Sequence, residues 1–216
     1  MTVSIQLADP GTANRRHFIQ QVLPFLSLPG DRGIVDLGCG DGYYCGVLSE
    51  VSRALLGGQL PAYRGFDLDE DALARARAEY PHAEFHSGDI TNGIAADSLA
   101  SGLTLCCETF SILPDLEGLL ERMLTHTEGT VAFDFLWSTD GSTEDHVLPL
   151  RVLPPFSYHL RSQRSTFEIL VRVLGRHPEF HVRHTSSWAF SPTAMEEFTG
   201  VAGVQAANVW WVLGRD

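Results

Sequence analysis

The feature that most constrains this chain is segment 34–42, IVDLGCGDG, in which a short apolar run meets three alternating glycines. Ile34, Val35 and Leu37 predict a buried parallel strand, and a helical pattern begins near Tyr43. The glycines let the backbone approach a ligand and expose N–H groups where a helix begins and partial positive charge collects. The segment therefore predicts a strand–turn–helix unit that binds a polar ligand.

The spacing of the glycines narrows the choice of ligand. The dinucleotide motif G-x-G-x-x-G would need glycine where Tyr43 stands, and the P-loop ending Gly-Lys-Ser/Thr is absent. The spacing acid-x-Gly-x-Gly-x-Gly resembles the first motif of the class I (Rossmann-like) S-adenosylmethionine-dependent methyltransferases; it is formed here by Asp36, Gly38, Gly40 and Gly42. The resemblance implies an α/β doubly wound, seven-stranded, mostly parallel sheet with an antiparallel last strand and helices on both faces. It also implies S-adenosylmethionine as cofactor and S-adenosylhomocysteine as product.

An acid ends the second predicted strand, residues 62–66. Asp67 follows Gly42 by roughly 25 residues, near the ~20 at which an acid reaches a nucleoside ribose. A carboxylate suits this role because two hydroxyls can each donate a hydrogen bond to it. Asp69 instead precedes the helical pattern 72–80 and is predicted to be its N-cap.

The third and fourth predicted strands also end in acids. The strand around 83–86 leads to Asp89 and Ile90, to which the resemblance assigns the adenine amino group and the ring. A buried strand over 103–107 ends at Glu108, which the sequence leaves open as a charge near the cofactor, a substrate contact or a solvated strand end. The cofactor site predicted in this way comprises Asp36, Gly38, Cys39, Gly40, Gly42, Asp67, Leu68, Asp89, Ile90 and Glu108.

Two segments outside these motifs are candidates for the substrate side. An apolar stripe over 13–28 predicts a helix that Pro24 kinks or ends, and that either covers the site or packs on the sheet. Residues 137–165 lack periodicity and exceed an ordinary connection of ~2–6 residues, which predicts a substrate lid. His146 and His159 on this segment are candidate catalytic bases because an unperturbed imidazole titrates near neutral pH.

The length and the remaining pattern predict one domain. With 216 residues and 44% hydrophobic side chains, the chain suits one well-packed core. Its predicted parts are an N-terminal helical cap (1–29), a cofactor-binding core (30–136), the lid (137–165) and C-terminal helices and strands (166–216). Further helices are predicted over 43–55, 115–127 and 165–174, and further strands over 130–136, 179–190 and 204–213.

Charge and cysteine content exclude several classes of function. The net charge is −12 and the chain has no lysine, which argues against binding to nucleic acid or to anionic lipid. The four cysteines form no C-x-x-C pair and are predicted to be buried thiols. Residues 1–10 show no basic region followed by an apolar stretch, and no window approaches the ~20 apolar residues of a membrane span, so a cytoplasmic protein is predicted. An alternating strand would place His181 and His184 on opposite faces, so no metal site is predicted.

The acidic composition and several aromatic side chains predict methyl transfer to a small, partly apolar metabolite. Three of these aromatic residues lie in the predicted lid, Trp137, Phe156 and Tyr158, and two lie outside it, Phe110 and Trp188. A methyltransferase acting on RNA or protein is an alternative that would gather the C-terminal arginines at the pocket mouth. The chain lacks the Asn/Asp-Pro-Pro-Tyr/Phe motif of many such enzymes. A non-methylating catalyst or binding module that retains the cofactor is a second alternative. A homodimer is compatible with the sequence, which does not fix the acceptor atom.

Overall fold

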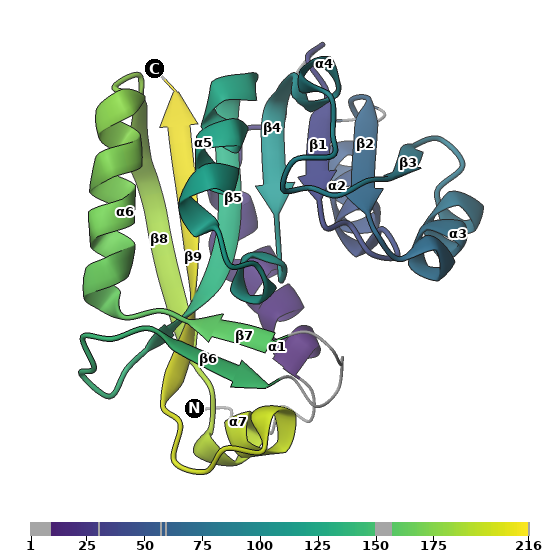
Figure 1. The fold of residues 1–216 in the computed structure, drawn as a ribbon. Coiled ribbons are helices and arrows are strands. Elements are labelled where there is room, and N and C mark those ends of the chain that lie inside the picture. The colour runs from purple at the N-terminus through teal and green to yellow at the C-terminus, as the bar shows by residue number, and fades with distance from the viewer. Residues whose placement is uncertain (1–9, 30, 57, 59, 150–156, 216) are drawn as a thin grey trace.

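The computed structural model describes residues 10–29, 31–56, 58, 60–149 and 157–215, which build a seven-stranded sheet between two layers of helices (Figure 1). The strand order is β3-β2-β1-β4-β5-β9-β8. Pairing is parallel from β3 to β5, and β9 is antiparallel to both of its neighbours. The predicted fold class is therefore confirmed. The strands are β1 (Ile34–Leu37), β2 (Tyr63–Asp67), β3 (Glu84–Ser87), β4 (Ser101–Cys106), β5 (Thr127–Ser138), β8 (Phe180–Ala189) and β9 (Ala206–Arg215).

Helices cover both faces because the central strands are apolar on both sides. Val131, Phe133 and Phe135 of β5 face one core, which α5 and α6 complete, whereas Ala132 faces the other. No helix in the described part of the chain is long and apolar enough to cross a bilayer. The helices of the two layers are α2 (Tyr43–Leu56) and α3 (Glu70–Glu79) on one face, and α4 (Ala96–Leu99), α5 (Leu116–His126) and α6 (Gln163–Arg176) on the other. Asp69 caps α3, as predicted, by accepting from the N–H groups of Asp71 and Ala72.

The N-terminal segment packs against β8 and β9, the last two strands of the sheet. It consists of α1 (Pro10–His17), a π-helical turn η1 (Phe18–Val22) and a 3-10 turn η2 (Leu23–Phe25). Phe18 is fully buried against Tyr44 and Trp210, and Phe25 stacks on His184 with ring centroids 3.7 Å apart. The helical conformation ends just after Pro24. Phe18 and Val22 of the apolar stripe are buried, whereas Ile19 and Phe25 are exposed.

The segment predicted to be an irregular lid contains regular structure. Strand β5 continues to Ser138 because it pairs with β9 along its whole second half. A two-stranded hairpin follows, formed by β6 (His146–Pro149) and β7 (Ser157–Leu160), with a short helix α7 (Pro192–Thr199) nearby (Figure 1). Residues 150–156, which include the aromatic candidate Phe156, lie outside the described residues, as do residues 1–9 of the predicted cap.

A β-bulge in β8 corrects the prediction for the histidines. His181 pairs with Gly214 and His184 with Val212, so Arg183 is an extra residue between them. Gly214 and Val212 lie two positions apart on β9, which places both histidines on the same face of the sheet, not on opposite faces. Within the described residues, no group of three or more His, Cys, Asp or Glu side chains is arranged to hold a metal ion.

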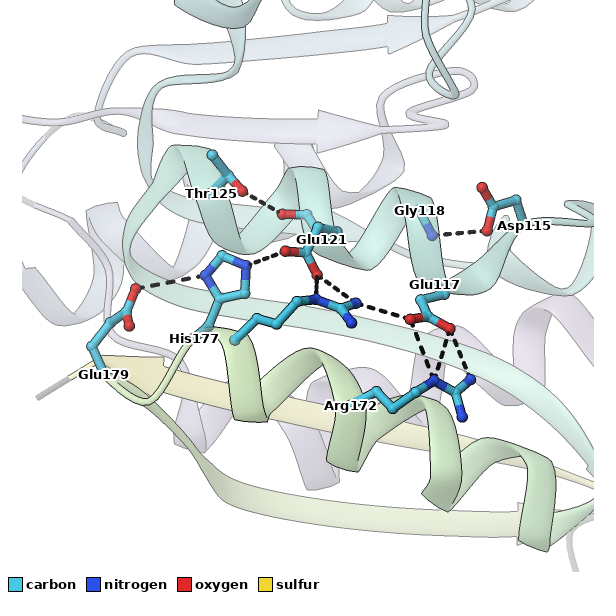
Figure 2. Close-up of polar contacts among 9 residues, drawn as sticks. Asp115, Glu117, Gly118, Glu121, Thr125, Arg172, His177 and Glu179 are labelled. Carbon is cyan, nitrogen blue, oxygen red and sulfur yellow. Dashed lines mark hydrogen bonds and ion pairs between the residues drawn. The ribbon is translucent and has the colours of Figure 1, made fainter.

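A ladder of ion pairs joins α5 to α6 on the outer surface (Figure 2). Glu117 accepts from Arg172 at 2.8 Å and from Arg176 at 2.9 Å, and Glu121 accepts from Arg176 and contacts His177. Hydrogen bonds from these arginines lower the pKa of Glu117 to about 2. About half of each arginine side chain is exposed, so water and salt screen these pairs and their contribution to stability is modest.

Candidate functional site

The Gly-rich turn between β1 and α2 forms an open cradle. Gly38, Gly40 and Gly42 all have positive φ angles, of 79°, 52° and 82°. A Cβ atom on Gly38 would overlap the Thr109 side chain, whereas one on Gly40 would meet no atom within 4 Å. Gly38 is therefore needed where two segments of the protein approach closely, and Gly40 borders open space at the N-terminus of α2.

Asp67 lies against this turn. Its Oδ2 accepts a hydrogen bond from the Gly40 N–H at 2.8 Å, and its Oδ1 accepts from the Asp69 N–H at 2.9 Å. The next residue, Leu68, is 64% exposed although it is apolar. Because a carboxylate has about four acceptor positions, Asp67 retains capacity for two further donors. The structure thus brings together the turn, a carboxylate and an exposed apolar side chain.

Asp89 lies one strand farther along the same edge. Its Oδ1 accepts from both the N–H and the hydroxyl of Thr91, at 2.8 and 2.6 Å. These bonds lower the pKa of Asp89, so the carboxylate is charged at neutral pH. Its Oδ2 has no partner among the described residues. Ile90 is only 7% exposed and packs in the core, so its side chain offers little surface to a ligand.

Asp36 and Cys39 lie below the turn. Asp36 is fully buried, and its Oδ2 accepts a hydrogen bond from the Tyr63 hydroxyl, while its Oδ1 has no partner among the described residues. Burial raises the pKa of Asp36 to about 7, against the effect of the Tyr63 bond. Cys39 is 4% exposed, and burial raises its pKa. Both buried side chains therefore belong to the packing around the turn and not to the open surface over it.

Glu108 follows β4 and joins a buried polar cluster. Its backbone has a φ of 60°, which is uncommon outside glycine, and its N–H donates to Asp134 Oδ1 at 2.6 Å. Asp134 in β5 is 2% exposed, and its Oδ2 accepts from Asn14 and Asn208 at 2.7 and 2.6 Å. Asn14 of α1 therefore connects the N-terminal segment to the carboxyl end of the sheet. The Asn14 Oδ1 in turn accepts from Asn208 and from the indole N–H groups of Trp188 and Trp210.

Neither known protein-family models nor curated protein sequences match this chain, but solved structures do. A putative S-adenosylmethionine-dependent methyltransferase from Listeria monocytogenes aligns with 95% of this chain and 99% of its own, with a TM-score of 0.67 at 14% identity. The magnesium protoporphyrin IX methyltransferase from Synechocystis PCC 6803, solved with bound S-adenosylmethionine, aligns over 100% and 86%, with a TM-score of 0.60 at 12% identity. An S-adenosylmethionine-dependent methyltransferase from Mesorhizobium loti aligns over 89% and 95%, with a TM-score of 0.59 at 19% identity.

The chain has the class I methyltransferase fold. In this fold the carboxyl ends of the parallel strands form one edge of the sheet, which is where open α/β sheets bind ligands. The Gly-rich turn, Asp89 and Glu108 follow parallel strands, Asp67 is the last residue of one, and all four therefore lie at this edge.

The hairpin lies near the same edge of the methyltransferase fold (Figure 1). The Arg161 guanidinium anchors it by donating to the carbonyls of Leu113 and Pro114, at 3.3 and 2.9 Å. Tyr158 is paired with the buried Leu148 and faces inward, and burial, together with Glu108 and Asp134, raises the pKa of Tyr158 to about 12.

The two histidines of the hairpin lie on opposite faces of it, and His146, which pairs with the buried Leu160, shares the face of Tyr158. His159 pairs with Val147, which is 63% exposed, and so lies on the opposite face from Tyr158. Burial and the charge of Arg161 lower the pKa of His159. The His146 ring contacts the Ser142 hydroxyl at 3.2 Å. The catalytic role of either histidine stays a prediction.

Asn14 and Asp134 lie in the candidate site but are not among the site residues predicted from the sequence. Asp134 interrupts the apolar run 131–136, and a charge within a buried strand requires buried partners, so a signal was present for it. Asn14 shows no comparable signal, because a polar residue early in an amphipathic helix is ordinary.

Proposed function

We propose that this protein transfers the methyl group of S-adenosylmethionine to a small, partly apolar metabolite. The observation that carries the proposal is the 2.8 Å bond from the Gly40 N–H to Asp67, which holds an acid against the Gly-rich turn of a methyltransferase fold. Open space over Gly40 and the exposed Leu68 side chain leave room for a nucleoside beside this acid.

The residues present fit each part of the cofactor. The N–H groups at the start of α2 suit a carboxylate, Asp67 suits the two ribose hydroxyls, and the unpartnered Oδ2 of Asp89 suits the adenine amino group. When bound, the cofactor supplies an electrophilic methyl group on a sulfonium. The task of the protein is then to position the acceptor and to exclude water.

The surroundings of Glu108 favour a small acceptor over a polymer. Tyr44 and Tyr158 lie beside it, which suits a partly apolar molecule. Three of the described C-terminal arginines that a polymer could use are engaged elsewhere: Arg161 binds backbone carbonyls, and Arg172 and Arg176 bind glutamates of α5 (Figure 2). These pairings and the net charge of −12 argue against an RNA substrate.

Calorimetry and methyl labelling test the proposal. S-adenosylhomocysteine is expected to bind and NAD is not. Incubation of the protein with methyl-labelled S-adenosylmethionine and a cell extract is expected to label a small molecule, which mass spectrometry identifies. Binding of NAD alone rejects the proposal. Label in the RNA or protein fraction favours a polymer substrate, and cofactor binding without any labelled product favours a non-methylating module.

The hairpin is expected to act on the acceptor and not on the cofactor. Tyr158→Ala should lower kcat/KM for the labelled acceptor but leave S-adenosylhomocysteine affinity within about twofold, because a contact confined to one ligand changes only that ligand's free energy. His159→Gln tests the candidate base on the other face of the hairpin, and a base there predicts the same fall in kcat/KM. If Tyr158→Ala also weakens the cofactor strongly, the hairpin is part of the cofactor site. If His159→Gln leaves turnover unchanged, this histidine is not a catalytic base.

A further inference from the structure

Glu108 is held in place by its backbone and not by its carboxylate. Its φ of 60° is a left-handed conformation that a β-carbon disfavours, and the 2.6 Å bond from its N–H to Asp134 fixes that conformation. Such backbone strain persists where surrounding contacts over-determine it and is concentrated at functional sites. The side chain consequently projects from the carboxyl end of β4, between β1 and β5, and 31% of it is exposed.

The two carboxylate oxygens of Glu108 differ in their surroundings. Oε1 lies 3.3 Å from the Tyr44 hydroxyl, 3.4 Å from Asn14 Nδ2 and 3.9 Å from Arg15 Nε, which are long contacts for a carboxylate. Oε2 has no partner among the described residues. One oxygen is thus loosely held by three donors and the other is available to a ligand.

Charged and titratable groups from four elements face Glu108. They are Asp134 of β5, Arg15 of α1, Tyr43 and Tyr44 of α2 and Tyr158 of β7, and the Cys107 thiol precedes Glu108 in the chain. Burial, followed by the charge of Asp134, raises the pKa of Glu108 to about 7, and Arg15 opposes this rise. A carboxylate with a pKa near neutral is a much stronger base than an ordinary glutamate.

On the basis of the proposed function, we propose that Glu108 is the catalytic proton acceptor, and that the acceptor atom of the substrate is a hydroxyl oxygen or an amine nitrogen. The acceptor atom forms a bond to the methyl carbon with its lone pair, and the carbon–sulfur bond breaks with its electron pair going to sulfur. The proton of the acceptor moves to Glu108 Oε2. The products are the methylated substrate, neutral S-adenosylhomocysteine and protonated Glu108, which releases its proton to solvent.

Sinefungin tests this assignment without knowledge of the substrate. This analogue carries a primary ammonium group where the cofactor carries its methylated sulfur, so it reports the charge at the place of transfer. Calorimetry should show that the wild-type protein prefers sinefungin to S-adenosylhomocysteine, and that Glu108→Gln reduces this preference by about tenfold, because a hydrogen bond to a charged group is stronger than one to a neutral group by about that factor. The exposed Glu50→Gln in α2 is the matched control and should keep the preference.

The pH dependence of the wild-type protein provides a second readout that needs no variant. The preference for sinefungin should be full above pH 7 and should disappear as Glu108 becomes protonated below it. Carbon NMR of labelled glutamate carboxyls should show one group titrating near pH 7 in the protein without ligand. A preference that Glu108→Gln leaves unchanged, or a Glu108 carboxyl that titrates near 4.5, overturns the assignment while leaving the proposed function intact. Failure to bind any of these nucleosides overturns both.

Discussion

Replacing Asp67 with alanine is expected to weaken S-adenosylhomocysteine binding by roughly 10- to 150-fold, because hydrogen bonds to a charged group contribute about 1.5–3 kcal/mol. The variant removes the acceptor proposed for both ribose hydroxyls. It also removes the anchor of the Gly40 N–H and of the Asp69 N–H, so the turn loses part of its organisation. Isothermal calorimetry measures the affinity, and circular dichroism checks that the fold is retained.

A matched control for this variant lies four residues away. Asp71→Ala removes an exposed carboxylate from the first turn of α3 and should change the affinity less than twofold. If Asp67→Ala binds as tightly as the control, Asp67 serves only to fix the turn, and the ribose must be held by another group.

Replacing Asn14 with leucine is expected to destabilise the fold by about 3–5 kcal/mol, in the range seen when one partner of a buried charged network is removed. The Asn14 Oδ1 accepts three hydrogen bonds, from Trp188, Asn208 and Trp210, at 3.2, 2.6 and 2.8 Å, and its Nδ2 donates to Asp134. Leucine has a similar volume but leaves these buried groups without that partner. Urea denaturation measures the free energy of unfolding.

The pH dependence of this loss follows from Asp134. Burial raises the pKa of Asp134 to about 6, so the carboxylate is charged above that pH and neutral below it. The bond from Asn14 favours the charged form of Asp134, and the loss of stability in Asn14→Leu should therefore be largest above pH 6 and smaller below it.

Asn92→Ala, at an exposed loop position, should change stability by less than about 0.5 kcal/mol. Equal stability of Asn14→Leu and this control would contradict the role of the network.

The position of the candidate cofactor residues at one edge of the sheet could be predicted because their signals are local. The run from Ile34 to Gly42 specifies a strand and the turn that leads into a helix, Asp67 ends the next strand, and Asp89 comes two residues after β3. In a parallel sheet, consecutive strand ends meet at one edge, so residues found one after another in the chain become neighbours in space. The resemblance that these residues carry also implied the fold class.

The acceptor side was not predictable in the same way. Asp134 meets its partners Asn14 and Asn208 across 120 and 74 positions of the chain, and no periodicity encodes such a pairing. The sequence of the predicted lid shows no periodicity because strands β6 and β7 are only four residues long, too short for an alternating pattern to stand out. The bulge at Arg183 likewise depends on the pairing with β9 and not on the sequence of β8 itself.

The contact between Asn14 and the last strand has a consequence for the order of folding. Asn14 leaves the ribosome early, yet its partners Asn208 and Trp210 lie 194 and 196 positions later. Strands β1 to β5 can pair in sequence during synthesis, whereas α1 has no polar partners in β9 until almost the whole chain has emerged. Closure of the Asn14 network is therefore a late event, and the environment that makes Glu108 a base arises only in a chain that has finished folding.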